Sequence, residues 1–290
     1  MTTQSPPDEA REAVEEVCGT GVDLELISDR RGSAVYQATG PKRSAAVKIG
    51  AGPEGSAITG REAEALSAMA AEGALLAHGQ GRRAAWMVTP WYEGPSTWEA
   101  LADVRYGDGN LDAALSRVVE LCEAVAQLHQ ADWVHGDLQP GHAIHTDRGV
   151  ALIDCSWAWH PEKLFPSMLF RGGMPHLLAP ELAASVEAGQ RPVTPSRSAE
   201  VYTLAASLWW AISGTWPLDY EAAGIDPTRL MAAQLRRRIG SGRLKPRAAT
   251  AWPTVQDVLA AVIAEPPERR PAANELASQL RSSGPCEEHR

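Results

Sequence analysis

Two aspartates, Asp137 and Asp154, are the residues in this chain whose positions most favour chemistry. Asp137 lies in the segment Trp133–His142 (WVHGDLQPGH), and Asp154 ends the segment Ala151–Asp154 (ALID). Each carboxylate follows a short apolar stretch, and both are expected on adjacent loops. Such a pair suits a magnesium–phosphate site, because one carboxylate holds the metal and the other accepts a hydroxyl proton. An isolated aspartate at a turn is more often a solvated cap, but the motifs around these two argue against that role.

The elements that must position these carboxylates form two parts of different character. The first part has short β-branched and alternating segments bounded by Gly, Pro or charged residues. They predict strands over Leu24–Ile27, Ala34–Ala38, Ala45–Ile49 and Ala84–Val88, with one helix opening at Gly60. In the second part, apolar periodicity predicts helices over Leu111–Gln130, Glu200–Ser213 and Ala272–Leu280, with short strands over Ala143–His145 and Val150–Ile153.

These elements predict an α+β protein of two lobes. Residues 1–22 are expected to form a polar N-terminal lead-in that contains a short acidic helical stretch, Asp8–Val17. A sheet-rich lobe over 23–90 and a helical lobe over 91–281 follow, and residues 282–290 are expected to be a disordered tail. A chain of 290 residues is long enough for two lobes with buried cores.

Composition and charge exclude several classes of function. The chain has 27 basic and 36 acidic side chains, with a formal net charge of −9, so no nucleic acid is expected as a partner. No apolar run approaches the roughly 20 residues of a membrane span, and the first residues lack the apolar core of a signal peptide. The four cysteines have no metal-ligand spacing. The sequence therefore predicts a cytoplasmic protein that does not associate with a membrane.

The motif order resembles that of eukaryotic-type protein kinase domains, from about Leu24 to Leu280. The Ala-Val-Lys ending at Lys48 resembles V-A-I-K, the His-Gly-Asp ending at Asp137 resembles H-R-D, and the Asp-Cys-Ser opening at Asp154 resembles D-F-G. The helix glutamate that pairs with the lysine in this family corresponds to Glu62, with Glu64 as the alternative.

Three further matches concern structural residues of the larger lobe. Glu181 belongs to an A-P-E motif, and Arg270 matches the late arginine that pairs with that glutamate in the family. Glu200 opens the buried helix that usually begins with aspartate. The resemblance implies a bilobal protein-kinase-like fold, with a small antiparallel sheet lobe carrying one helix and a larger helical lobe.

The resemblance also implies cofactors and roles. ATP and Mg²⁺ are the expected cofactors, with Lys48 and Glu62 fixing the phosphates and Asp154 holding the metal. Asp137 is expected to orient the acceptor hydroxyl and accept its proton. The segment that joins the lobes in kinases corresponds to residues 87–94, with Thr89 as gatekeeper and adenine bonding the Pro90 carbonyl and the Tyr92 N–H. A proline-rich turn between strands is the alternative interpretation of that segment.

Several positions depart from the family pattern. The phosphate loop expected at Ser28–Val35 keeps only Gly32, so Arg31 is a candidate to supply charge to the nucleotide; a solvated hairpin tip is the alternative. Gln139 replaces the catalytic-loop lysine, which removes a cation worth about 2–4 kcal/mol in a dry site. His142 replaces the metal-binding asparagine, and an imidazole ligand favours Mn²⁺ over Mg²⁺.

The activation segment also departs from the pattern. Cys and Ser follow Asp154 where the family has Phe-Gly, and Met174 replaces a threonine that contacts Ser/Thr substrates. The aromatic residues of this segment are expected either to form a substrate-binding platform or to pack against the larger lobe; they are Trp157, Trp159, Phe165 and Phe170.

Two functions from different classes follow. The first is an ATP-dependent phosphotransferase acting on Ser/Thr hydroxyls of a protein or peptide. H-G-D is frequent in aminoglycoside-type phosphotransferases and in kinase domains of lanthipeptide synthetases, while the A-P-E motif favours a protein or peptide acceptor over a small molecule. A ribosomally made precursor peptide is therefore a specialised candidate for the acceptor. Its phosphorylated Ser/Thr residues would then undergo elimination by a separate lyase, which is the expected partner. The second function is a pseudokinase that acts as a scaffold or allosteric partner of another enzyme.

Overall fold

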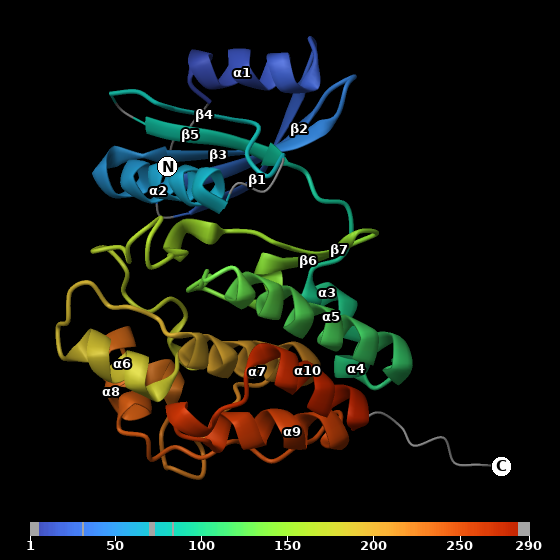
Figure 1. The fold of residues 1–290 in the computed structure, drawn as a ribbon, viewed down its shortest axis with the longest axis vertical. Helices are drawn as coiled ribbons and strands as arrows, with labels where there is room; N and C mark the ends of the chain where they lie inside the picture. The colour runs from blue at the N-terminus through green and yellow to red at the C-terminus, as the bar shows by residue number, and fades with distance from the viewer. Residues whose placement is uncertain (1–5, 31, 70–72, 83, 284–290) are drawn as a thin grey trace. The chain divides into compact units, whose positions relative to one another are not determined.

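The computed structural model describes residues 6–30, 32–69, 73–82 and 84–283. It is a mixed α+β structure with a small antiparallel sheet and a largely helical part, as predicted, and the sheet has five strands (Figure 1). The chain divides into two compact units. Unit 1 comprises Met1–Tyr92 and Asp154–Ala158, and unit 2 comprises Glu93–Ile153 and Trp159–Arg290.

A five-stranded sheet forms the centre of unit 1, with strand order β1-β2-β3-β5-β4. The strands are β1 (Asp23–Arg30), β2 (Ser33–Thr39), β3 (Ser44–Ala51), β4 (Ala77–Gln80) and β5 (Ala84–Pro90). Four of them confirm the predicted strands. The edge strand β4 escapes prediction because its sequence, AHGQ, lacks β-branched residues and contains glycine.

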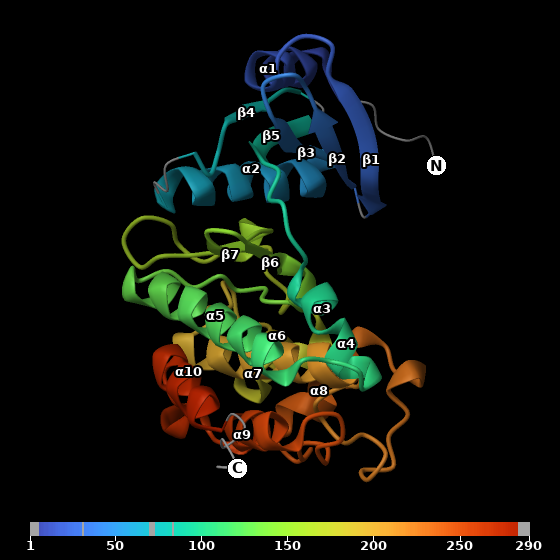
Figure 2. The same cartoon turned by 90° about the vertical axis from the view of Figure 1, so that its right-hand side faces the viewer.

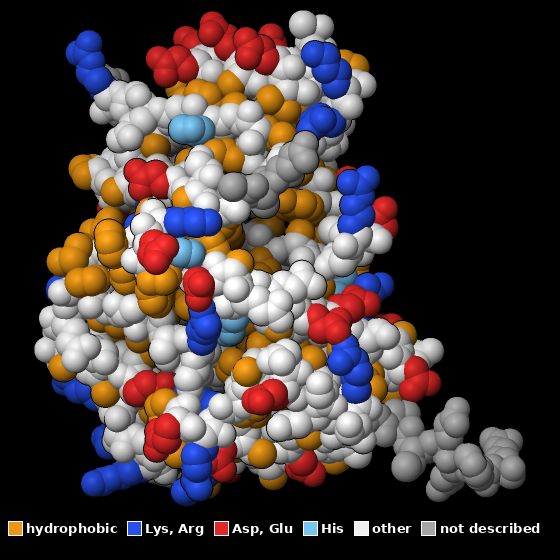
Figure 3. All heavy atoms as spheres, in the orientation of Figure 1, with side chains coloured by type: hydrophobic (Ala, Val, Ile, Leu, Met, Phe, Trp, Pro, Cys, Tyr) orange, Lys and Arg blue, Asp and Glu red, His pale blue; other side chains and the backbone are white. Residues whose placement is uncertain are grey.

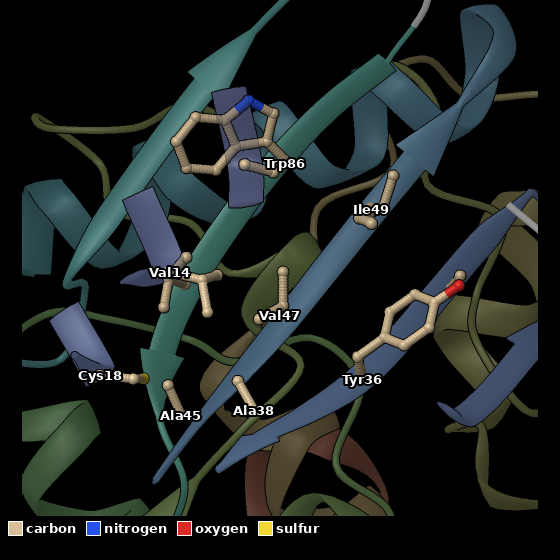
Figure 4. Packing of buried hydrophobic residues seen from close by; sticks show 11 residues of the cluster. Val14, Cys18, Tyr36, Ala38, Ala45, Val47, Ile49 and Trp86 are labelled. Atoms are coloured by element: carbon tan, nitrogen blue, oxygen red, sulfur yellow. The ribbon is translucent and has the colours of Figure 1, made fainter. Parts of the chain in front are cut away.

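One face of this sheet packs against helix α1 (Asp8–Cys18) to form the core of unit 1. Val47 and Trp86 from the sheet and Val14 from the helix lie in this core (Figure 4). The predicted acidic stretch is thus a helix that covers the sheet. Its outer face carries the acidic residues of the helix, which gather at one end of the space-filling view (Figure 3).

The opposite face of the sheet carries helix α2 (Gly52–Met69), as Figures 1 and 2 both show. The helix begins eight residues before the predicted start at Gly60, since the sequence GAGPEG over 50–55 argues against a helix. Gly50 and Gly55 allow close packing instead. A Cβ on Gly50 would lie 2.0 Å from the Gly55 carbonyl oxygen, and a Cβ on Gly55 would lie 2.5 Å from that of Gly32.

Unit 2 is built from helices and one short hairpin. The helices are α3 (Thr97–Ala100), α4 (Ala102–Tyr106), α5 (Leu111–Gln130), α6 (Pro180–Glu187), α7 (Arg197–Ser213), α8 (Ala232–Gly240), α9 (Pro253–Ala264) and α10 (Ala273–Ser282), and the hairpin pairs β6 (Ala143–Thr146) with β7 (Gly149–Leu152). The predicted helices α5, α7 and α10 are confirmed. Helix α7 is buried along most of its length, as its apolar sequence predicts. None of the helices in the described ranges is long and apolar enough to cross a bilayer.

Two segments differ from the predicted organisation. Asp154–Ala158 lies within the predicted helical lobe, 91–281, but groups with unit 1. The reason is that Cys155 and Ala158 hydrogen-bond to side chains of α2. Of the predicted tail, 282–290, Ser282 ends helix α10, and residues 284–290 lie outside the described residues.

Candidate functional site

Lys48 lies between two carboxylates in unit 1. Its Nζ is 2.5 Å from Glu62 Oε2 and 2.5 Å from Asp154 Oδ1. The side chains of Lys48 and Glu62 are only 13% and 4% exposed, whereas that of Asp154 is 40% exposed. Asp154 is therefore the member of this cluster most accessible to a ligand.

The electrostatics of the cluster favour a charged lysine. Burial by itself would lower the pKa of Lys48, but the carboxylates of Glu62 and Asp154 raise it above its ordinary value. The set of one ammonium group and two carboxylates has a net charge of −1. A further cation, or a metal beside a phosphate, is thus electrostatically favourable near Asp154.

Strand and helix periodicity bring Lys48 and Glu62 together. In β3, Val47 and Ile49 are buried in the core shared with α1, so Lys48 points to the opposite face, where α2 lies. In α2, Glu62 is buried and Glu64 is exposed. The helix therefore directs Glu62, and not the alternative Glu64, toward the lysine.

Ser156 joins the two carboxylates of the cluster. Its Oγ donates to Glu62 Oε2 at 2.8 Å and lies 3.3 Å from Asp154 Oδ1, while the backbone N–H of Cys155 donates to Glu62 Oε1 at 3.1 Å. Asp154 itself has φ 61°, a left-handed turn that directs the chain back onto α2. Glu62 thus fixes both the lysine and the segment that follows Asp154.

Asp137 lies in unit 2, on the loop before the short 3₁₀ helix Pro140–His142. Gln139 Nε2 donates to Asp137 Oδ1 at 3.0 Å, and His142 Nδ1 donates to the Asp137 carbonyl oxygen at 2.8 Å. Gly173 packs against the same carboxylate, since a Cβ there would lie 2.4 Å from Asp137 Oδ1. The carboxylate is held by its own loop on one side and by a glycine turn on the other.

Glu200 supports the backbone of this loop from helix α7. Its carboxylate accepts hydrogen bonds from the N–H groups of His135 (3.1 Å) and Gly136 (2.7 Å) and from His129 Nε2 (2.8 Å). Burial would raise the pKa of Glu200, but the His129 and Gly136 hydrogen bonds lower it below the ordinary value. Gly136 has φ 82°, where glycine is favoured over the arginine of the family pattern.

His135 and His142 have assigned tautomers because each bonds to a carbonyl oxygen. His135 Nε2 donates to the Ile153 carbonyl at 3.0 Å, and its Nδ1 accepts from the Asp137 N–H at 3.3 Å. In His142 the proton is on Nδ1, so Nε2 carries the lone pair that a metal ligand needs.

The described residues contain no group of three or more His, Cys, Asp or Glu side chains that would hold a metal by themselves. Within the cluster of Lys48, Glu62 and Asp154, it is Asp154 that supplies the more accessible carboxylate. One carboxylate fits the way Mg²⁺ binds at nucleotide sites, where phosphate oxygens and waters complete the octahedron. The residues therefore fit a metal that arrives with a nucleotide, and they do not form a dedicated cage.

The remaining predicted nucleotide-binding residues lie along β5 and just after it. Thr89 pairs with Ala46 and Pro90 with Ala45 in the β3–β5 ladder, which puts Thr89 on the same face of the sheet as Lys48. Burial raises the pKa of Tyr92, with Cys155 nearby as a second cause. Arg31 lies outside the described residues.

Glu181 and Arg270 form a bidentate ion pair within unit 2. Arg270 Nη1 lies 2.5 Å from Glu181 Oε1, and Nη2 lies 2.9 Å from Oε2. The Arg270 side chain is 2% exposed and also donates to the carbonyls of Ser198 and Glu265. The pair ties α6 to the start of α7 and to the segment before α10.

The aromatic residues between Asp154 and Glu181 separate into different environments. Phe170 is buried, and Trp159 Nε1 donates to the Pro195 carbonyl, so both pack within unit 2. Trp157 is half-buried in unit 1, and Phe165 is 71% exposed. Packing therefore accounts for Phe170 and Trp159, and Phe165 is the aromatic residue that remains on the surface.

The roles of two residues of the site were not predicted from the sequence. Ser156 stands where the family has glycine, so no side-chain role was expected there. Gly173 precedes Met174, and its doublet with Gly172 was the only available signal of a tight approach to Asp137.

No protein-family model matches the sequence.

Proposed function

We propose that this chain is an ATP-dependent phosphotransferase of protein-kinase-like fold that phosphorylates Ser or Thr hydroxyls of a protein or peptide. The observation that carries the proposal is the ion-paired set of Lys48, Glu62 and Asp154. Burying a lysine and a glutamate costs free energy that well-packed apolar residues would not cost. A phosphate-binding role would explain why charged side chains occupy these buried positions.

In the proposed function, Lys48 binds the α- and β-phosphates and Glu62 holds the ammonium group in place. Asp154 would hold Mg²⁺ or Mn²⁺, which neutralises charge on the phosphates when it is bound. Thr89, Pro90 and Tyr92 would contact the adenine. ATP as donor also agrees with a cytoplasmic location.

Asp137 is the proposed base. Its carboxylate would orient the acceptor hydroxyl and accept the proton as the new O–P bond forms. Gln139 and Gly173 fix the position of that carboxylate. Most of the rate would come from positioning, since little covalent chemistry is left to the protein.

A precursor peptide in ribosomal peptide biosynthesis is the proposed specialised acceptor, with a separate lyase eliminating the phosphate.

The second candidate function, a pseudokinase, is favoured by one observation. The Gln139 amide donates to the Asp137 oxygen at 3.0 Å, at the position where the family has a lysine. In that function the chain would act as a scaffold or allosteric partner of another enzyme.

The test is transfer of ³²P from [γ-³²P]ATP to a degenerate Ser/Thr peptide library in Mg²⁺ and in Mn²⁺. Wild type is expected to label the library, and Lys48→Met and Asp154→Asn are expected to lose at least about 100-fold in rate. Asp147→Asn, an exposed aspartate in the β6–β7 turn, is the matched control and should retain full activity. Full transfer by Asp154→Asn would refute the assigned role of Asp154, and no transfer by wild type would favour the pseudokinase.

A further inference from the structure

A groove in unit 2 combines arginine side chains with an apolar floor. It has a volume of about 490 Å³, and its lining includes Arg237, Arg238 and Arg243 but no acidic residue. Ile225, Leu230 and Leu244 are half-buried in the same lining. A volume in this range is typical of sites that bind a ligand or a few side chains.

Helix α8 presents one face to this groove. Gln234, Arg237, Arg238 and Ser241 line it and are spaced i, i+3, i+4 and i+7, which puts them on one side of the helix and its end. Leu235 and Ile239 are buried on the other side. Helix α8 lies beside α6, as Figures 1 and 2 both show.

The arginines of α8 are not equivalent. Glu187, at the end of α6, accepts hydrogen bonds from Arg236 Nε at 2.8 Å and Arg237 Nε at 3.0 Å, which anchors the helix. Arg238 and Arg243 are exposed, and neither forms an ion pair with any residue of the described ranges. These two guanidinium groups are therefore available to an anionic ligand.

The charge around the groove is opposite to that of the molecule. Residues 227–250 contain seven cationic side chains and no aspartate or glutamate, although the chain as a whole has a net charge of −9. The nearest acid in sequence, Asp226, pairs with Arg229. The half-buried aliphatic floor suits apolar side chains better than phosphate groups, so a peptide fits this groove better than a nucleic acid does.

We propose that this groove binds an acidic peptide segment that also carries aliphatic side chains. Its carboxylates would pair with Arg238 and Arg243, and its aliphatic side chains would contact Leu230 and Leu244. The charged contacts are exposed, so binding should weaken as ionic strength rises. The inference does not depend on phosphoryl transfer, because binding alone is measured.

The test is fluorescence anisotropy of the full chain with a fluorescein-labelled decapeptide in which leucine alternates with glutamate. Saturable binding is expected at 50 mM salt, with at least a tenfold weaker Kd at 500 mM. Arg238→Glu combined with Arg243→Glu should weaken binding at least tenfold, and Leu244→Ser should weaken it several-fold. Arg148→Glu, an exposed arginine in the β6–β7 turn, should leave the Kd unchanged.

Three results would overturn the proposal. The first is no saturable binding of the acidic peptide by wild type. The second is an equal loss in Arg148→Glu, which would indicate a general charge effect. The third is tighter binding of phosphatidylserine vesicles or of a single-stranded DNA oligonucleotide than of the peptide. Thermal denaturation of each variant separates loss of binding from loss of folding.

Discussion

The hydroxyl of Ser156 donates a hydrogen bond to the carboxylate of Glu62 at 2.8 Å, between residues 94 positions apart in the chain. Ser156 is buried, and its Oγ also lies 3.3 Å from Asp154 Oδ1. One hydroxyl thus fixes the separation of the two carboxylates that flank Lys48. In the proposed function this serine is a positioning residue for the nucleotide and its metal.

Removing this hydroxyl should slow phosphoryl transfer without unfolding the protein. A hydrogen bond to a charged group contributes about 1.5–3 kcal/mol, so Ser156→Ala is expected to lower kcat/KM for ATP by about ten- to a hundredfold. Steady-state kinetics with [γ-³²P]ATP measures this change. Ser167→Ala, in the same segment, is the control and should remain within a factor of two. Equal rates for Ser156→Ala and wild type would show that the bridge has no positioning role.

Enlarging Gly173 should displace the proposed base. A Cβ at this position would lie 2.4 Å from Asp137 Oδ1, and φ is 60°, so Gly173→Ala is strained in two ways. Transfer is expected to fall at least tenfold, while MgATP affinity by calorimetry stays unchanged. Gly141→Ala is a matched control in the short 3₁₀ helix after Asp137, because a Cβ there would meet nothing within 4 Å. The prediction fails if both alanine variants behave alike.

The identity of residue 142 should set the metal preference. Because His142 Nε2 carries the lone pair and imidazole suits Mn²⁺ better than Mg²⁺, wild type is expected to transfer faster with Mn²⁺. His142→Asn should reverse that order by restoring an oxygen ligand. Rates across a titration of each metal measure the ratio, and His78→Asn, an exposed histidine on β4, should leave it unchanged. An Mg²⁺ preference in wild type would contradict the assignment.

Acid should destabilise unit 2 through His176. Burial lowers the pKa of His176 to about 4, from an ordinary value of 6.5. The ring stacks on Trp216 with centroids 3.9 Å apart, and its Nδ1 lies 3.1 Å from the Tyr220 hydroxyl oxygen. Because the unfolded chain binds more protons between pH 6.5 and 4, the free energy of unfolding falls as the pH falls through that window.

The measurement is urea denaturation at a series of pH values from 7 to 4. The free energy of unfolding of wild type should fall more steeply than that of His176→Phe, which keeps an aromatic ring and cannot be protonated. Burial also lowers the pKa of His145, but that residue is present in both proteins and contributes equally. Parallel pH curves would rule out His176 as the source of acid sensitivity.

Motif order was enough to predict that Lys48, Glu62 and Asp154 belong to one cluster, because each sits in an element whose periodicity or turn the sequence specifies. The start of α2 was predicted too late, since Gly50, Gly52 and Gly55 read as helix breakers. The role of Gly50 and Gly55 depends on how closely α2 approaches the rest of unit 1, and local helix propensity carries no information about that approach.

Ser156 illustrates a second limit of the sequence. Its partners lie 94 residues away on α2 and two residues away at Asp154. A pattern based on the family motif predicts what is usual at that position, which is glycine, and gives no information about a new hydroxyl. The grouping of Asp154–Ala158 with unit 1 depends on these same long-range hydrogen bonds.

The most direct measurement of the proposed function compares wild type with Asp137→Asn in two assays on the same samples. In the proposed function both proteins bind MgATP with the same Kd by calorimetry. Transfer of the γ-phosphoryl group to the Ser/Thr peptide library should fall by about 10²–10⁴ in Asp137→Asn, the range that a general base contributes. Equal transfer by the two proteins, or no MgATP binding by wild type, would contradict the account.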